Sequence, residues 1–183
     1  APHTLNGIDY MKTAVYINGD KQIPLIGDYN LITWMEDNIQ GTPVVLEAQM
    51  SEYLLGSRIV MNTGFPTLLG YRFHQSQQRS IESMGDLIWG RVANIATLYY
   101  TPEIDVARQM LRVYNVQYVV VGDLEHALYH PDEKHPYDGL AKFDQMVKQG
   151  MLTVVYDDQK GTRLYHVEPS AVSVVNTQLG VVQ

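Results

Sequence analysis

The chain has 183 residues, of which 45% are hydrophobic and 18% are charged, a composition that suits one globular domain and argues against disorder. Its formal net charge is −7 and its Lys and Arg residues are few and scattered, which argues against a nucleic-acid-binding protein, since such proteins carry a basic patch. The absence of cysteine excludes disulfides, thiolate nucleophiles and cysteine-ligated zinc.

Neither a membrane helix nor a signal peptide is indicated by the sequence. No apolar run reaches the roughly 18 residues that a membrane-spanning helix needs. The first residues, Ala1-Pro2-His3-Thr4, contain no initiator Met and no signal-peptide pattern. We therefore expect a piece of a longer protein, or the mature end of a processed one.

The N-terminal part predicts a lead-in followed by a helix. Residues 1–27 contain several Gly, Pro and Asn and predict an extended lead-in. Asp28 can cap a helix with its carboxylate, and the apolar residues that follow share one helical face, which predicts a helix over 28–39. Gly41 and Pro43 end this helix.

Two short β-branched runs and a further helix follow. The run 43–48 predicts a buried strand, and Arg58–Asn62 is a second strand candidate. Residues 63–67 have the composition of a turn. A helix is predicted over 81–96.

A helix that leads directly into a strand is the clearest α/β signal in the chain. Thr101 as cap and Pro102 in the first turn predict a helix over 102–115, and Asn115 can end it in a left-handed conformation. The run 117–122 is the most distinct strand. Because this order is typical of α/β proteins, it sets the fold class.

The C-terminal part predicts a loop, a short helix and a hairpin. Residues 123–139 predict a polar loop, and 140–148 a helix that Gly150 stops. The segments 152–156 and 163–167 alternate around a five-residue loop, which predicts a β-hairpin.

We thus expect one α/β domain over 28–168, with a mixed sheet flanked by helices and a closing C-terminal hairpin. Residues 169–183 are expected to form an extended or edge tail.

The segment 64–79 carries the most unusual cluster of polar side chains. Gly64, Pro66 and Gly70 restrict the backbone conformation of the loop. Amide, imidazole and guanidinium side chains follow within a few residues of one another. Such groups suit a sugar, a phosphate or a carboxylate. The candidate ligand-binding residues are Arg72, His74, Gln75, Gln78 and Arg79, with Glu47. The alternative is a structural loop whose polar groups pair with the backbone.

Glu47 lies inside an apolar strand, where an ionised carboxylate needs a partner. Arg58, Arg72 or Arg79 is the expected partner. Such a buried pair is structural as often as it is functional.

No motif indicates catalysis, a cofactor or a metal. His126 and His130 are four residues apart, but the segment lacks a His-Glu-x-x-His pattern and is interrupted by Pro131 and Pro136, so we expect no metal. Phosphate-binding glycine loops and a nucleophile elbow are also missing. We therefore expect no catalytic residue and no cofactor in this chain.

Several blocks resemble the C-terminal region of the YYY-type multi-spanning membrane proteins. They are Gly41–Ala48, Ser57–Ile59, Thr63–Thr67, Leu69-Gly70, His74–Arg79, Leu98–Thr101, Tyr114–Glu125, Gly139–Asp144 and Val154–Tyr156. Together they cover most of residues 4–167 in one order.

The resemblance implies a host with many membrane helices, similar to the membrane glycosyltransferases that use lipid-linked sugars, with this domain outside the cytoplasm. The catalytic acid of such a transferase is expected in a loop between membrane helices, which this chain does not contain. The chain departs from the family pattern at Gln75 and near Asn94 and His126, where an acid, an Asp and an Arg are expected. These departures suggest a diverged copy that keeps the scaffold and not the activity.

Three functions are therefore weighed. The first is a non-catalytic extracytoplasmic domain of a glycosyltransferase-like membrane protein, which assists binding of an acceptor or lipid-linked sugar. The second is a structural or assembly subunit that docks on membrane-embedded partner subunits. A free-standing enzyme ranks last. Upstream membrane helices in the same gene would favour the first, and an isolated gene the second.

Overall fold

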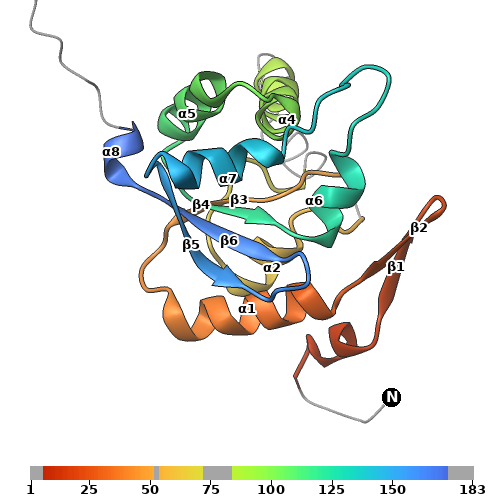
Figure 1. Cartoon of the computed structure of the whole chain (residues 1–183). Helices are drawn as coiled ribbons and strands as arrows, with labels where there is room; N and C mark the ends of the chain where they lie inside the picture. The colour runs from red at the N-terminus through yellow and green to blue at the C-terminus, as the bar shows by residue number, and fades with distance from the viewer. Residues whose placement is uncertain (1–5, 52–53, 72–83, 173–183) are drawn as a thin grey trace, which may run out of the picture.

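The computed structural model describes residues 6–51, 54–71 and 84–172. They form an α/β domain in three layers, with a mixed sheet between two layers of helices (Figure 1). The predicted fold class, with helices flanking a mixed sheet and a closing C-terminal hairpin, is confirmed.

The central sheet has four strands in the order β3-β4-β6-β5. The strands span Val44–Leu46 (β3), Val116–Val121 (β4), Leu152–Asp157 (β5) and Arg163–Val167 (β6). β3 and β4 are parallel, whereas β6 is antiparallel to both β4 and β5. The four strands predicted at 43–48, 117–122, 152–156 and 163–167 thus lie in one sheet.

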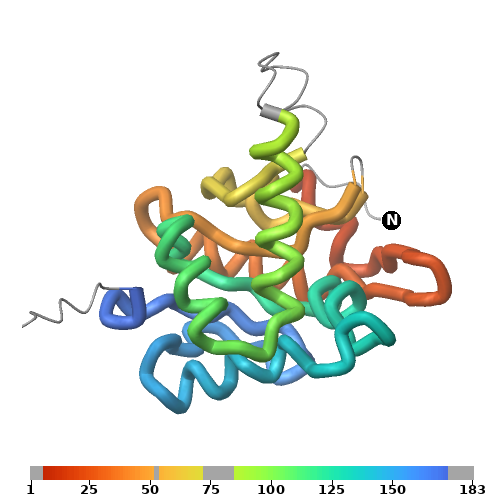
Figure 2. Tube along the Cα trace, turned by 90° about the horizontal axis from the view of Figure 1, so that it is seen from above, coloured from red at the N-terminus to blue at the C-terminus, as the bar shows by residue number. Residues whose placement is uncertain are grey.

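Helices cover both faces of this sheet. One layer contains α4 (Met84–Tyr100), α5 (Ile104–Val113) and α7 (Ala141–Lys148), and the other contains α1 (Ile26–Asn38) and α2 (Arg58–Thr63) (Figure 1). In the view from above, α4 and α5 lie side by side over the strands (Figure 2). The predicted helices at 28–39 and 102–115 correspond to α1 and α5.

The alternation of side chains along the strands creates two separate cores. Val119 and Val121 of β4 pack in the core beneath α4, α5 and α7, whereas Val120 packs in the core beside α1 and α2. Tyr165 and Leu164 of β6 divide between the two cores in the same way. Because successive strand residues point to opposite faces, a strand buried on both sides reads as a continuous apolar run.

A second, two-stranded sheet lies at the margin of the domain, within the predicted lead-in. A short 3-10 helix, Asp9–Lys12, is followed by β1 (Val15–Asn18) and β2 (Lys21–Pro24), which form an antiparallel hairpin that projects from the side (Figure 1). Gly19 adopts a positive φ of 64° in its two-residue loop, a conformation that glycine reaches without strain. The proposed domain boundary after residue 27 stays a prediction.

The predictions for Arg58–Asn62 and for residues 123–139 were wrong. Arg58–Asn62, a strand candidate, belongs to helix α2. The β-branched Ile59 and Val60 favour a strand, but their N–H groups donate to the carboxylate of Glu47 at 2.9 Å each, which stabilises the first turn of a helix instead. The predicted polar loop 123–139 begins with a helix, α6 (Asp123–Leu128), because the Glu125 carboxylate accepts the N–H of Gly122.

Asp28 does not cap α1, as its position suggested. The helix begins at Ile26, and Asp28 lies in its first turn with its side chain turned into the domain. Asn115 adopts the predicted left-handed conformation after α5, with φ of 50°. At the end of the described chain, Pro169–Val172 form a short helix, α8, where an extended tail was expected.

Among the described residues, no helix combines the length and the apolar character needed to cross a bilayer.

Candidate functional site

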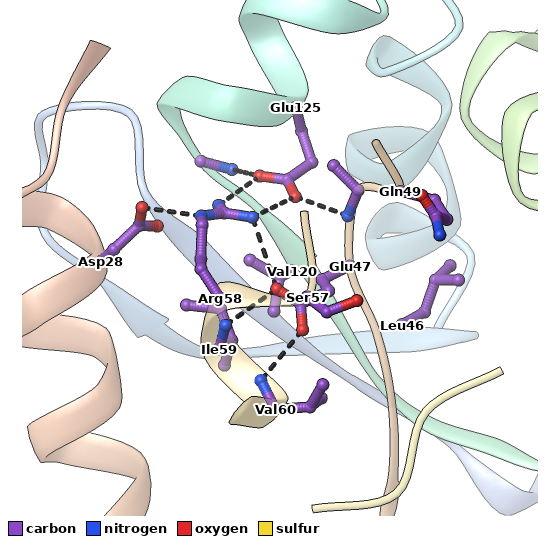
Figure 3. A network of polar contacts seen from close by, with 12 residues as sticks. Asp28, Leu46, Glu47, Gln49, Ser57, Arg58, Ile59, Val60, Val120 and Glu125 are labelled. Atoms are coloured by element: carbon purple, nitrogen blue, oxygen red, sulfur yellow. Dashed lines mark hydrogen bonds and ion pairs between the residues drawn. The ribbon is translucent and has the colours of Figure 1, made fainter. Parts of the chain in front are cut away.

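The most concentrated polar chemistry in the described part of the chain surrounds the guanidinium of Arg58. Arg58 is the first residue of α2 and is 5% exposed. Three acidic side chains from different elements converge on it: Asp28 of α1, Glu47 after β3 and Glu125 of α6 (Figure 3). We refer to these four residues as the Arg58 cluster.

Each nitrogen of the Arg58 guanidinium has a carboxylate partner. Nε donates to Oδ2 of Asp28 at 2.7 Å, and Nη2 donates to Oε2 of Glu125 at 2.9 Å. Nη1 is shared between Oε1 of Glu125 at 3.1 Å and Oε2 of Glu47 at 3.4 Å. Glu125 is thus held by two parallel hydrogen bonds, the geometry in which Arg binds carboxylates most strongly.

Backbone N–H groups also donate hydrogen bonds to the carboxylates of the two glutamates. Glu47 accepts the N–H groups of Ile59 and Val60, and Glu125 accepts those of Ala48 and Gly122. The cluster therefore links the segment after β3 to the starts of α2 and α6 (Figure 3). Both glutamates follow the carboxyl ends of the parallel strands β3 and β4, where side chains from neighbouring strands meet.

Burial gives the three acids different pKa values. Burial raises the pKa of Glu47 to about 7, against the lowering effect of Arg58 and of two backbone N–H groups. Burial also raises the pKa of Asp28, and Arg58 offsets only part of this effect. Burial acts in the same direction on Glu125, but Arg58 and the hydrogen bonds to Glu125 prevail and lower its pKa.

All four members of the Arg58 cluster are buried. Asp28 and Glu47 are each 3% exposed and Glu125 is fully buried, so no acid faces solvent. No buried side-chain nitrogen or oxygen of the described residues lacks a hydrogen-bond partner. A fully paired, inaccessible ion network is suited to fixing four chain segments together rather than to transferring protons to a ligand.

The predicted pairing of Glu47 with an Arg, with Arg58 among the named candidates, is confirmed. The sequence interpretation missed Asp28 and Glu125 as further partners. Asp28 was assigned to a helix cap and Glu125 to a polar loop, although Glu125 follows the most distinct strand by only four residues. Its position after the strand was the one available signal.

The other predicted ligand residues, Arg72, His74, Gln75, Gln78 and Arg79, lie outside the described residues, so their role stays a prediction. The chain that leads to them is described as far as Tyr71. It is tied to the core at successive carbonyl groups: Pro66 accepts from Val45 N–H, Leu68 from Arg91 and Gly70 from Gln49. The Leu69 carbonyl also accepts from the hydroxyl of Ser57, which precedes Arg58, so the described chain is anchored just before Arg72.

In the described ranges, no group of three or more His, Asp or Glu side chains could hold a metal ion. His130 instead lies 2.9 Å, at Nδ1, from the amine of Lys21, which also donates to the carbonyl of Ala127. His126 lies on α6. The side-chain amide of Asn94, on α4, donates to the hydroxyl of Tyr114.

No family model and no curated protein matches the sequence. Among solved structures, the chain is similar to the C-terminal globular domain of an oligosaccharyltransferase from Archaeoglobus fulgidus, with a TM-score of 0.47 and 11% identity. The match covers 78% of this chain and 97% of that domain. Likeness at this level assigns neither a family nor an activity.

Proposed function

We propose that this chain is a non-catalytic domain on the extracytoplasmic face of a glycosyltransferase-like membrane protein, where it helps to bind an acceptor or a lipid-linked sugar. The proposal builds on the resemblance of its sequence blocks to YYY-type membrane proteins. In the structure, three of these blocks, 41–48, 57–59 and 114–125, meet at the Arg58 cluster.

The complete pairing of the Arg58 cluster is the observation that carries the non-catalytic part of the proposal. A general acid or base must reach the proton that it transfers, directly or through one water. Glu47, Asp28 and Glu125 are all buried, and each is bonded to Arg58. These acids therefore support a scaffold rather than a reactive centre.

The anchored segment 66–71 supports the binding part of the proposal. Its hydrogen bonds to Val45, Gln49 and Arg91 fix the chain just before Arg72. A segment that starts from a fixed point loses less conformational entropy when its side chains engage a ligand. Guanidinium, imidazole and amide groups from Arg72 to Arg79 match the phosphate oxygens and hydroxyls of a lipid-linked sugar.

Vesicle binding tests the proposal. Phosphatidylcholine vesicles with and without a polyprenyl-phosphate mannose are sedimented with the purified chain. We expect more chain to sediment with the sugar-bearing vesicles, and this difference to disappear in the Arg72→Ala/Arg79→Ala double variant. The matched control is Arg112→Ala, an exposed Arg of α5, which should bind as the unchanged chain does. Equal sedimentation with both kinds of vesicle contradicts the proposal.

A second candidate is an assembly subunit that docks on a membrane complex. Val15 and Ile17 of β1 are 47% and 59% exposed, and because they alternate along the strand they present one apolar face of the hairpin. The mass of the native polypeptide in membrane fractions, read on an immunoblot, separates the two candidates. A polypeptide far larger than 20.8 kDa supports the first, and one of about this mass that is released with its partners supports the second.

A further inference from the structure

A groove of about 450 Å³ lies between the end of α4 and the loop that precedes α7. Tyr100 and Thr101 form one side, and the segment 134–137 forms the other. The volume falls within the range of small-ligand sites in proteins. This groove is remote in sequence from Arg72–Arg79, and nothing in the proposed function uses it.

A stacked aromatic pair joins the two sides of the groove. The rings of Tyr100 and His135 stack with their centroids 3.7 Å apart and an interplanar angle of 14°. The Tyr100 hydroxyl donates to the carbonyl of Leu128, and Tyr129 packs edge-on against the same ring at 5.1 Å. Tyr100 therefore cannot turn away without losing these contacts.

Asp132 fixes the other member of the pair. Its Oδ1 accepts the backbone N–H groups of Lys134 and His135 and lies 3.1 Å from Nδ1 of His135. The N–H of Asp132 donates back to the carbonyl of His135, which closes a tight turn. With Nδ1 engaged by Asp132, Nε2 is the ring nitrogen left to meet a ligand.

The loop is also pinned on the far side of the groove. Gly139 packs so closely against the carbonyl groups of Tyr99 and Tyr100 that a side chain there would collide with them. The buried amine of Lys142 donates to the carbonyls of Tyr99 and Gly139, at 3.2 and 2.7 Å. Both ends of the loop are thus tied to the end of α4, so the groove exists before any ligand arrives.

The side chains that line this groove indicate the chemical class of ligand that it would bind. Tyr137 is 67% exposed beside the stacked pair and offers a free aromatic face, next to the hydroxyls of Thr97 and Thr101. Among the described residues that line the groove, none carries a carboxylate and Lys134 is the one permanent cation. Aromatic faces with a few hydroxyl and amine groups match a ring with apolar C–H faces and a hydroxyl rim, whereas a phosphate would call for more positive charge.

We propose that the groove between Tyr100 and Tyr137 binds a saccharide, with a pyranose ring against the aromatic side chains and its hydroxyl groups bonded to Thr97, Thr101 and Lys134. The groove goes beyond the proposed function, which uses the segment Arg72–Arg79. The two are tested separately, because soluble saccharides test the groove and lipid-linked sugars test that segment.

The test is an NMR titration of the full chain with methyl α-glucopyranoside, maltose and N,N′-diacetylchitobiose. We expect at least one of these probes to shift amide signals of residues 96–101 and 134–137, with a dissociation constant on the order of 1 mM. Tyr137→Ala should weaken this binding about tenfold, whereas Tyr137→Phe, which keeps the ring, should preserve most of it. Tyr10→Ala removes a comparably exposed Tyr, 57% exposed, away from the groove and should change nothing.

Three outcomes overturn the proposal: no shifts with any probe at tens of millimolar, shifts confined to residues away from the groove, or a Tyr137→Ala variant that folds and binds as before. The amide spectrum of each variant reports folding in the same experiment. Because Tyr137 is exposed and hydrogen-bonds no core residue in the described contacts, its replacement should leave that spectrum otherwise intact.

Discussion

Arg58 and Glu125 form a two-point ion pair inside the domain, with Nη1–Oε1 and Nη2–Oε2 distances of 3.1 and 2.9 Å. The pair joins the first residue of α2 to α6, two elements that are 67 positions apart in the chain. Both side chains are buried, and the charge of Glu125 is compensated by Arg58.

Replacement of Arg58 by Met should destabilise the domain severely. The variant keeps much of the side-chain volume but leaves Asp28, Glu47 and Glu125 buried without a cation. The free energy of unfolding, measured by urea denaturation at pH 7.5, should fall by about 3–5 kcal/mol. Arg112→Met, at an exposed position of α5, is the control and should change stability by less than about 1 kcal/mol. A loss as small as that of the control would mean that the cluster does not hold the fold together.

The stability of the protein should depend on pH through Glu47. Its pKa is about 7 in the folded state against 4.5 when unperturbed, so between these values the folded state binds more protons than the unfolded one. The contribution of Glu47 to stability is therefore fully present below pH 4.5 and is lost as the pH rises towards 7, a change of about 3 kcal/mol.

Glu47→Gln isolates this effect, because Gln does not titrate. The unfolding free energy of the unchanged chain minus that of the variant should therefore decrease as the pH rises from 5 to 8. Taking the difference cancels the titration of Asp28 and Glu125, provided that their environments are kept. A difference that stays constant across this pH range would contradict the prediction.

Lys142 should give a pH dependence of the opposite sign at higher pH. Burial lowers the pKa of this amine to about 7 from 10.5, so above pH 7 the folded state binds fewer protons than the unfolded state. Relative to Lys142→Met, the unchanged chain should gain about 2–3 kcal/mol in unfolding free energy between pH 7 and pH 9. Equal slopes for the two proteins in this range would show that the amine stays charged in the fold.

Gly139 should tolerate no side chain. A methyl group at this position would meet the carbonyl oxygens of Tyr99 and Tyr100, which belong to the end of α4 and cannot move alone. We expect Gly139→Ala to lower the melting temperature markedly, with a loss of at least about 2 kcal/mol. Gly90→Ala, in the middle of α4 with open space around it, should instead stabilise the protein by up to about 1 kcal/mol. If both variants lose stability equally, the close contact at Gly139 is not what matters.

The strands and long helices could be predicted because their patterns are local. Val116–Val121 is buried on both faces, and the apolar run of these residues is visible in the sequence without knowledge of any partner. The helix before it and the hairpin after it have equally local signals, a Thr-Pro start and an alternation around a turn. For these elements, most of the predicted ends lie within two residues of the ends in the structure.

The tertiary structure decided those features that depend on contacts between residues far apart in the sequence. Ile59 and Val60 became helical, against their preference, because the Glu47 carboxylate, 12 and 13 positions away, accepts their N–H groups. From the sequence, Asp28 was interpreted as a helix cap and Glu125 as a loop residue. Only the fold shows that both contact Arg58. By itself the sequence determined the α/β class and the need of Glu47 for a cation. Only the tertiary structure showed that Arg58 is the partner of Glu47 and that Asp28 and Glu125 join them in a buried cluster. The physical reason is that a buried charge without a partner costs too much free energy, so the fold must bring all the partners together.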